Sequence, residues 1–198
     1  MNLKDMLIEE GIVKIKGKDE QLFTLKSGKK SRLFIDIKEA SLNPRILKKI
    51  TQNVVEVITE DIPGMSMTSA NFSDEHLFLF DKIGSVAIGG IPIATTLSIE
   101  TNIRQIIVRS EKHESGTETK VIGNCKKQKV LLIEDVSTTG NSIVNAVISI
   151  REAGGICNNC IVIINRQEGA DELCKKNSIN LYSLLKKSDF GIKEELTI

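Results

Sequence analysis

The most constraining feature of this sequence is one continuous stretch, Val130–Ser142, which reads VLLIEDVSTTGNS. It begins with an apolar run that is typical of a strand buried on both faces of a parallel sheet. Two adjacent carboxylates, Glu134 and Asp135, end this run, and a loop of small hydroxyl residues with Gly140 leads into a segment of helical spacing. The stretch therefore predicts a strand, a loop and a helix, with polar groups gathered at the carboxyl end of the strand.

Strand-like and helix-like segments alternate along most of the chain. This alternation is typical of βαβ units, so we expect an α/β fold with a mainly parallel central sheet flanked by helices. The predicted strands cover residues 22–25, 33–37, 83–88, 103–109, 129–134, 160–164 and 179–184. The predicted helices cover residues 1–10, 141–153 and 171–176, with one more opened by Asn43-Pro44 and one after Gly89-Gly90. Residues 110–124 are predicted to form a polar loop, and residues 63–80 have no clear assignment.

Length and charge narrow the class of protein. With 198 residues, 40% of them hydrophobic, the chain suits one globular domain spanning residues 1–198. The net charge of +1 gives no basic surface that would favour a nucleic-acid partner. No apolar run has the length of a membrane span, and the N-terminus lacks a signal-peptide core. We therefore expect a cytoplasmic protein with no membrane partner and with reduced cysteines.

Cys157 and Cys160 form a CxxC pair ahead of a predicted strand. A zinc site would need further ligands, for which Cys125 and Cys174 are candidates only if they fold nearby. A redox dithiol usually opens a helix, whereas this pair leads into a strand. We interpret the two cysteines as small buried residues, because free cysteine packs like a small hydrophobe.

The stretch after the buried strand suits an anion. A helix N-terminus with free backbone N–H groups and hydroxyl side chains is a ready phosphate site, and Gly140 allows a close backbone approach. Glu134 and Asp135 would repel a phosphate, so they are expected to face ribose hydroxyls or a metal ion. Each feature alone also fits an ordinary strand-to-helix turn with two solvated acids, and only the whole array favours a site.

This array resembles the phosphoribosyl pyrophosphate (PRPP) motif of the type I phosphoribosyltransferases. The resemblance implies that Glu134 and Asp135 act in catalysis and bind the ribose hydroxyls, and that residues 137–142 cradle the 5′-phosphate. It also implies a type I phosphoribosyltransferase fold with residues 1–42 as a small N-terminal hood and residues 43–198 as the core. The PRPP-binding residues implied in this way are Lys26, Gly89, Gly90, Arg109, Glu134, Asp135, Val136, Ser137, Thr138, Thr139, Gly140, Asn141 and Ser142.

Three further segments are similar to the orotate phosphoribosyltransferases, particularly their archaeal form. Residues 23–41, FTLKSGKKSRLFIDIKEAS, imply that Lys26 reaches the active site and that Phe34 lies over the base. Residues 87–94, AIGGIPIA, resemble the pyrophosphate loop, in which backbone amides of a Gly-Gly turn meet the diphosphate. In INRQEG, residues 164–169, Arg166 corresponds to the arginine that holds the orotate carboxylate, with Thr138 beside the base. Taken singly, these segments also fit a surface hairpin, a helix entry and a solvated arginine.

The loop between the second and third predicted strands of the core, 103–109 and 129–134, departs from the family pattern. It reads VRSEKHESGTETKVIG, in which Arg109 matches a family arginine while Ser110, His113 and Ser115 replace two lysines and a histidine. A family lysine of the pyrophosphate loop also falls on Gly89. The resemblance implies that loop 110–122 acts across a homodimer on the partner's site, so Lys112 or His113 is expected to carry its catalytic charge.

The function implied is the conversion of orotate and PRPP to orotidine 5′-monophosphate and pyrophosphate in de novo pyrimidine biosynthesis. Mg²⁺ is the implied cofactor, bound mainly through PRPP, and no residue is assigned to a protein-held metal. One alternative is a phosphoribosyltransferase for another base, against which Arg166 and Lys26 argue. A second alternative is a non-catalytic PRPP-binding regulator that lost its loop lysines. The residues Ser110, His113 and Ser115, at positions where the family has two lysines and a histidine, favour this alternative.

Overall fold

A computed structural model describes residues 1–17, 19–24, 28, 30–62, 80–109 and 120–192. Lys26, Lys112, His113, Ser110 and Ser115 lie outside the described residues, as does nearly all of 63–80. Two groups of elements follow one another along the chain. The first group is α1 (Leu3–Glu9), β1 (Val13–Ile15), β2 (Phe23–Thr24), β3 (Lys30–Ser31), β4 (Leu33–Ile35), α2 (Ile37–Ala40) and α3 (Pro44–Glu60). The second is β5 (Lys82–Val86), α4 (Gly90–Thr101), β6 (Gln105–Val108), β7 (Val121–Ile122), β8 (Lys129–Ser137), α5 (Asn141–Glu152), β9 (Ile156–Asn165), α6 (Ala170–Lys176), β10 (Asn180–Lys186) and the 3₁₀ turn Lys187–Phe190.

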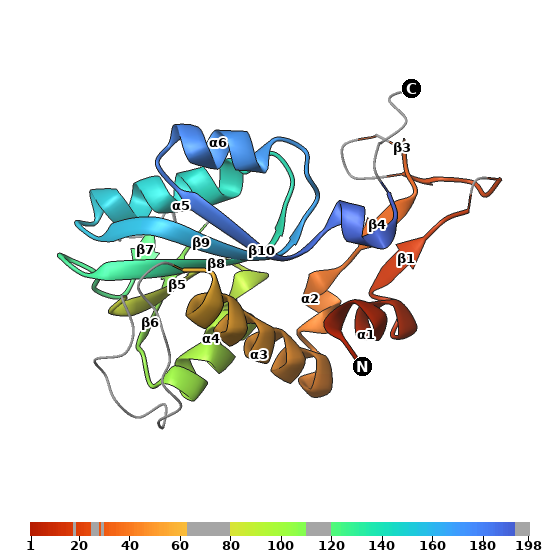
Figure 1. The fold of residues 1–198 in the computed structure, drawn as a ribbon. Helices are drawn as coiled ribbons and strands as arrows, with labels where there is room; N and C mark the ends of the chain where they lie inside the picture. The colour runs from red at the N-terminus through yellow and green to blue at the C-terminus, as the bar shows by residue number, and fades with distance from the viewer. Residues whose placement is uncertain (18, 25–27, 29, 63–79, 110–119, 193–198) are drawn as a thin grey trace.

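The central sheet has six strands in the order β10-β9-β8-β5-β6-β7. Every neighbouring pair is parallel except β6 and β7, which are antiparallel. Helices α3 and α4 cover one face and α5 and α6 the other (Figure 1). This arrangement confirms the predicted α/β fold with a mainly parallel sheet flanked by helices.

The core consists of two apolar layers, one on each face of the sheet. On the α3 side, the Asn43 side chain caps the helix and Pro44 occupies its first turn. The apolar residues of α3 that are fully buried are Ile46, Ile50, Val54 and Ile58. On the α5 side, the buried residues of α5 pack against β8 and β9 together with all four cysteines. Burial on both faces explains why β8 reads as an uninterrupted apolar run.

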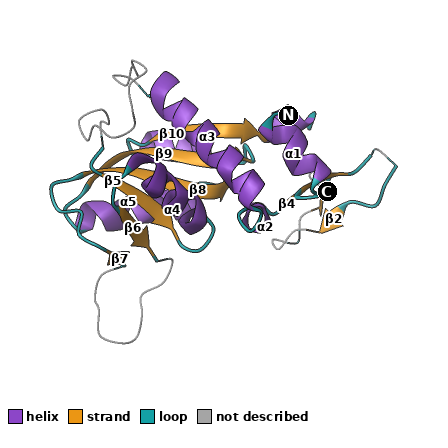
Figure 2. Ribbon diagram, turned by 90° about the horizontal axis from the view of Figure 1, so that it is seen from below, coloured by secondary structure: helices purple, strands orange, loops and turns teal. Residues whose placement is uncertain are grey.

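The N-terminal segment forms two small antiparallel ladders outside the central sheet. β1 pairs with β4, and β2 pairs with β3. The short helix α2 contacts β8, so the segment lies beyond the carboxyl ends of the central strands (Figure 2). No helix among the described residues is long and apolar enough to cross a membrane.

Several element boundaries differ from those expected. The strand predicted over 33–37 ends at Ile35, because the Asp36 side chain accepts a hydrogen bond from the Glu39 amide and starts α2. The predicted loop 110–124 contains β7, which pairs with β6 at the sheet edge. β8 continues through Ser137, so the acids lie within the strand rather than at its end. β9 begins at Ile156 and includes Cys157 and Cys160, both free and buried, as interpreted from the sequence.

Candidate active site

Glu134 and Asp135 lie near the carboxyl end of β8, and both residues are buried. As whole residues, Glu134 is 5% and Asp135 is 8% exposed, which is uncommon for ionisable residues and calls for specific partners. The Ser142 hydroxyl, in the first turn of α5, donates a hydrogen bond of 2.9 Å to Glu134 Oε1. The backbone N–H of Val136 donates to Asp135 Oδ1 at 2.9 Å. The strand, its loop and the following helix therefore form one unit around the two acids.

Burial and the neighbouring Asp135 charge raise the pKa of Glu134 to about 8, although the Ser142 hydrogen bond and Lys38 oppose this shift. The cause is the cost of placing a charge where water is excluded, with a second carboxylate alongside. A cation or a set of hydroxyl donors arriving at the pair would favour the ionised form. The free site is therefore prepared for a ligand that donates hydrogen bonds or brings positive charge.

We expect the raised pKa of Glu134 to make folding stability depend on pH. A carboxyl whose pKa is higher in the folded protein adds stability below its unfolded pKa, and this contribution is lost as the pH rises through about 8. Each pKa unit corresponds to about 1.4 kcal/mol, so the free energy of unfolding is expected to fall by a few kcal/mol between pH 5 and 8. Glu134→Gln stays neutral and should flatten this decline in urea unfolding.

The matched control for this prediction is the exposed Glu152→Gln. Its free energy of unfolding should fall with rising pH as much as that of the unmodified protein. Equal slopes of unfolding free energy against pH for Glu134→Gln and the unmodified protein would show that Glu134 does not carry the effect.

Asp135 is enclosed by a hood lysine and by the turn before α4. Lys38 Nζ, on α2, lies 3.5 Å from Asp135 Oδ2. A Cβ atom at position 89 would overlap the Asp135 carboxylate and lie 2.9 Å from its Cβ atom. A Cβ atom at position 90 would lie 2.6 Å from the Ile133 carbonyl oxygen. The Gly89-Gly90 turn thus lies against β8, and only residues without side chains fit there.

The loop after β8 exposes hydroxyl groups and the N-terminus of α5. Thr138 and Thr139 are exposed, and the Asn141 side chain donates to Thr139 Oγ1 at 3.1 Å. Gly140 has φ of 85°, a backbone conformation that favours glycine. A Cβ atom there would also lie only 3.0 Å from Ala170 Cα, so space is a second reason for glycine at this position. The buried Ser137 hydroxyl has no hydrogen-bond partner among the described residues. Backbone N–H groups and hydroxyls of this kind can receive a phosphate.

Arg166 follows β9 and is brought next to this loop by the sheet. Its backbone N–H donates to the Ser137 carbonyl oxygen at 2.9 Å, which continues the β8–β9 ladder past the last paired residues. Its side chain is 10% exposed, and Nε lies 2.8 Å from Glu168 Oε1. The guanidinium is therefore held in place at the carboxyl edge of the sheet, beside the predicted phosphate loop.

Arg109 follows β6 and borders a cavity of about 220 Å³ next to α5. The cavity is also lined by Ser142, the donor to Glu134, and by Lys120. The backbone N–H of Arg109 donates to the Lys120 carbonyl oxygen at 2.9 Å, so the two cations frame the start and the end of the loop region. Nothing in the sequence distinguished Lys120 from the other lysines of the loop as a candidate site residue.

Phe34 lies in β4 of the N-terminal segment. Its ring centroid is 5.6 Å from that of Phe23, and Lys14 Nζ lies 5.9 Å from its centroid. Both of these ring contacts of Phe34 lie within the N-terminal segment. The structure brings together Glu134, Asp135, the 137–142 loop, Gly89-Gly90 and Arg166, whereas Lys26, Lys112 and His113 lie outside the described residues.

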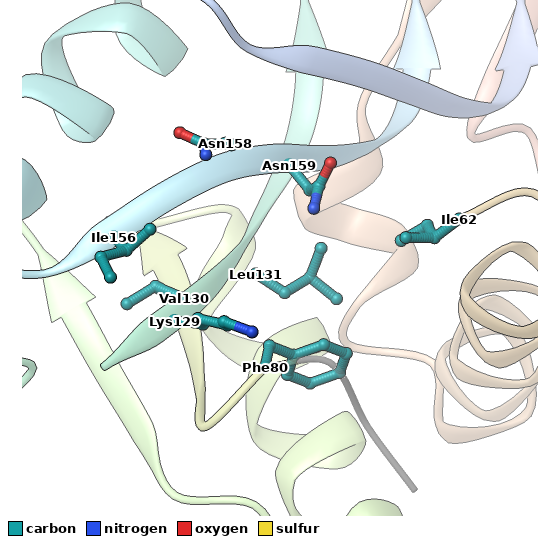
Figure 3. Close-up of a pocket in the computed structure, with 8 residues that line it drawn as sticks. All are labelled: Ile62, Phe80, Lys129, Val130, Leu131, Ile156, Asn158 and Asn159. Carbon is teal, nitrogen blue, oxygen red and sulfur yellow. The ribbon is translucent and has the colours of Figure 1, made fainter. Parts of the chain in front are cut away.

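A second cavity, of about 230 Å³, opens at the other end of the strands (Figure 3). It is lined by the first residues of β8 and β9 together with Ile62 and Phe80, and most of its lining is apolar. Glu134 and Asp135 lie at the opposite end of β8. This cavity therefore does not belong to the candidate site.

The fold and the sequence place the chain in a known class, that of the phosphoribosyltransferases. The family model described as a phosphoribosyl transferase domain matches residues 69–186, which is more than half of the chain. This range contains the turn before α4, the whole of β8 and its loop, and Arg166.

Similar proteins narrow the class further. The orotate phosphoribosyltransferase of Methanopyrus kandleri is 33% identical over 193 residues, which is 97% of this chain and 92% of the relative. That of Methanocaldococcus jannaschii is 40% identical over 164 residues, 82% of this chain and 83% of the relative. The crystal structure of the Aeropyrum pernix orotate phosphoribosyltransferase superposes with a TM-score of 0.77 at 26% identity, covering 94% of each chain. The chain belongs to the orotate phosphoribosyltransferase family.

Proposed function

We propose that this protein transfers the phosphoribosyl group of PRPP to orotate, which yields orotidine 5′-monophosphate and pyrophosphate in de novo pyrimidine biosynthesis. The observation that carries the proposal is the buried Glu134–Asp135 pair, flanked by the 137–142 loop and by the Gly89-Gly90 turn. The family relationship supports the same reaction. In this reaction the bond from ribose C1 to the diphosphate oxygen breaks, and its electron pair leaves with the diphosphate. A bond from C1 to the orotate nitrogen forms, and the proton of that nitrogen is released.

The two carboxylates are assigned to the ribose. Ionised Glu134 and Asp135 accept hydrogen bonds from the ribose hydroxyls, and their negative charge favours the oxocarbenium-like transition state, in which the ribose becomes positive. Residues 137–142 receive the 5′-phosphate through backbone N–H groups and hydroxyls, including the unpartnered Ser137 hydroxyl. The ribose is thereby fixed at both ends before bond breaking begins.

Arg166 is assigned to the orotate carboxylate, with Thr138 and Lys26 beside the base and Phe34 over its face. A guanidinium fork matches a carboxylate with two parallel hydrogen bonds. The Glu168 contact at 2.8 Å keeps the Arg166 side chain oriented before orotate binds. This arrangement favours orotate over bases that lack a carboxylate, because those bases leave the arginine without a matching acceptor.

The departing diphosphate is assigned to Arg109 and to Lys112 or His113. We propose that the protein is a homodimer in which loop 110–122 acts on the site of the other protomer. Cations at the leaving group stabilise the charge that develops there as the bond breaks. Lys120, which borders the same cavity as Arg109, adds positive charge on this side.

Mg²⁺ is proposed to enter with PRPP. Magnesium at such sites is held by one or two carboxylates together with substrate phosphates and water. Among the described residues, no group of three or more His, Cys, Asp or Glu side chains could hold a metal alone, whereas Glu134 and Asp135 suit an ion that PRPP helps to hold. The bound ion would neutralise charge on the diphosphate.

The test is a panel of bases with PRPP and Mg²⁺, in which orotate, uracil, adenine and hypoxanthine are compared by absorbance. Turnover of orotate alone is expected. Arg166→Ala should raise KM for orotate about tenfold or more, because a charge-assisted bidentate contact is lost, while Arg166→Lys restores part of it. Turnover of another base in place of orotate would overturn the substrate assignment. Binding of PRPP by calorimetry without any turnover would indicate a regulatory protein.

A further inference from the structure

The two buried carboxylates need a compensating cation, and the structure supplies it from the N-terminal segment. Lys38, on the short helix α2, forms the ion pair with Asp135 at 3.5 Å. The Asp135 side chain is only 12% exposed, whereas the lysine side chain is 63% exposed. One face of this ammonium therefore meets the acid and the rest of it meets solvent.

The Asp135 carboxylate connects the Lys38 ammonium to the Gly89-Gly90 turn. The oxygen that pairs with Lys38 is Asp135 Oδ2, and this same oxygen packs directly on Gly89. An anion held by the backbone N–H groups of the turn would thus lie beside both Asp135 and Lys38. Without a cation between them, the carboxylate would repel that anion.

We propose that Lys38 is a substrate-binding residue whose ammonium bridges Asp135 and the diphosphate of PRPP. This inference rests on the proposed function, because it extends the same site. A lysine ammonium has three N–H donors, so it can keep its bond to Asp135 and donate another to a phosphate oxygen. The bridge places positive charge between two negative groups that must bind side by side. It also joins the N-terminal segment to the catalytic strand when substrate is bound.

The test measures binding rather than turnover, so that it does not depend on the reaction. PRPP, inorganic pyrophosphate and ribose 5-phosphate are each titrated with Mg²⁺ into the full-length protein by calorimetry. The variants are Lys38→Met, which keeps length but removes charge, and Lys38→Arg, which keeps the charge. Lys48→Met, at an exposed position on α3, is the matched control.

Lys38→Met is expected to weaken PRPP and pyrophosphate about tenfold, which is about 1.4 kcal/mol of binding free energy. Ribose 5-phosphate, which lacks the diphosphate, should bind as it does to the unmodified protein, and Lys38→Arg should retain most of the affinity for all three ligands. Lys48→Met should change none of them. The loss should also shrink at high salt, since the ammonium is exposed.

Two results would overturn the bridge. An equal loss for ribose 5-phosphate would mean that Lys38 acts only by holding Asp135 toward the ribose. Unchanged affinities in Lys38→Met would mean that the ion pair has no part in binding. If the unmodified protein binds pyrophosphate but not PRPP, the proposed function is contradicted. The role of Lys38 is then tested by comparing the pyrophosphate affinity of Lys38→Met with that of the unmodified protein. Binding of neither ligand would overturn both.

Discussion

Asp135→Asn is expected to lower kcat/KM for PRPP by about 100-fold or more, with the fold intact. The substitution preserves the size of the side chain but removes its charge, and it leaves one acceptor oxygen where there were two. In the proposed reaction this carboxylate holds ribose hydroxyls and faces the positive charge that develops on the ribose. Its ion pair with Lys38 at 3.5 Å is lost as well.

Steady-state kinetics with orotate and PRPP measure this effect, and thermal unfolding checks that the variant is folded. Asp19→Asn, at an exposed position of the N-terminal segment, is the control and should match the unmodified enzyme. An Asp135→Asn enzyme whose kcat/KM stays within about threefold of the unmodified value would remove Asp135 from the catalytic machinery.

Gly89→Ala is expected to cost about 100-fold in PRPP turnover, although it adds a single methyl group. The backbone at position 89 has φ of −65° and ψ of −35°, which alanine adopts readily, so no backbone strain is involved. The added Cβ atom, however, would overlap the Asp135 carboxylate. Asp135 must then move away from Gly89, and in the proposed reaction its carboxylate would no longer face the ribose.

The control for this prediction is Gly17→Ala. A Cβ atom there would lie 3.4 Å from Glu20 Oε2, an ordinary contact, and far less disturbance is expected. Kinetics and a crystal structure of Gly89→Ala together measure the effect. Full activity with a displaced Asp135 would show that the orientation of this carboxylate does not control the rate.

Parts of the site that are contiguous in sequence were predictable. Val130–Ser142 indicated a buried strand, two acids and an anion-binding loop, because strand and helix periodicity fix the relative placement of residues close in sequence. A place for Arg166 in the site was implied only by the family resemblance, and the structure brings its backbone next to Ser137 through the pairing of β8 with β9. The roles of Lys112 and His113 stay predictions.

Other parts depended on packing between distant elements. The pairing of β1 with β4 had no local signal, because three-residue strands are too short for a clear alternation. The extension of β8 through Ser137 comes from its ladder to β9, which overrides the turn preference of the local residues.

The sequence by itself determined the α/β fold and the strand, acid pair and loop of Val130–Ser142, because these depend on the order of polar and apolar residues along the chain. Only the tertiary structure decided which cation meets Asp135, why position 89 has no side chain, and why the pKa of Glu134 rises to about 8. The first two properties arise where the N-terminal segment, the turn before α4 and β8 meet, and the third arises from the burial of Glu134 beside Asp135. Contacts of that kind are set by packing rather than by local sequence.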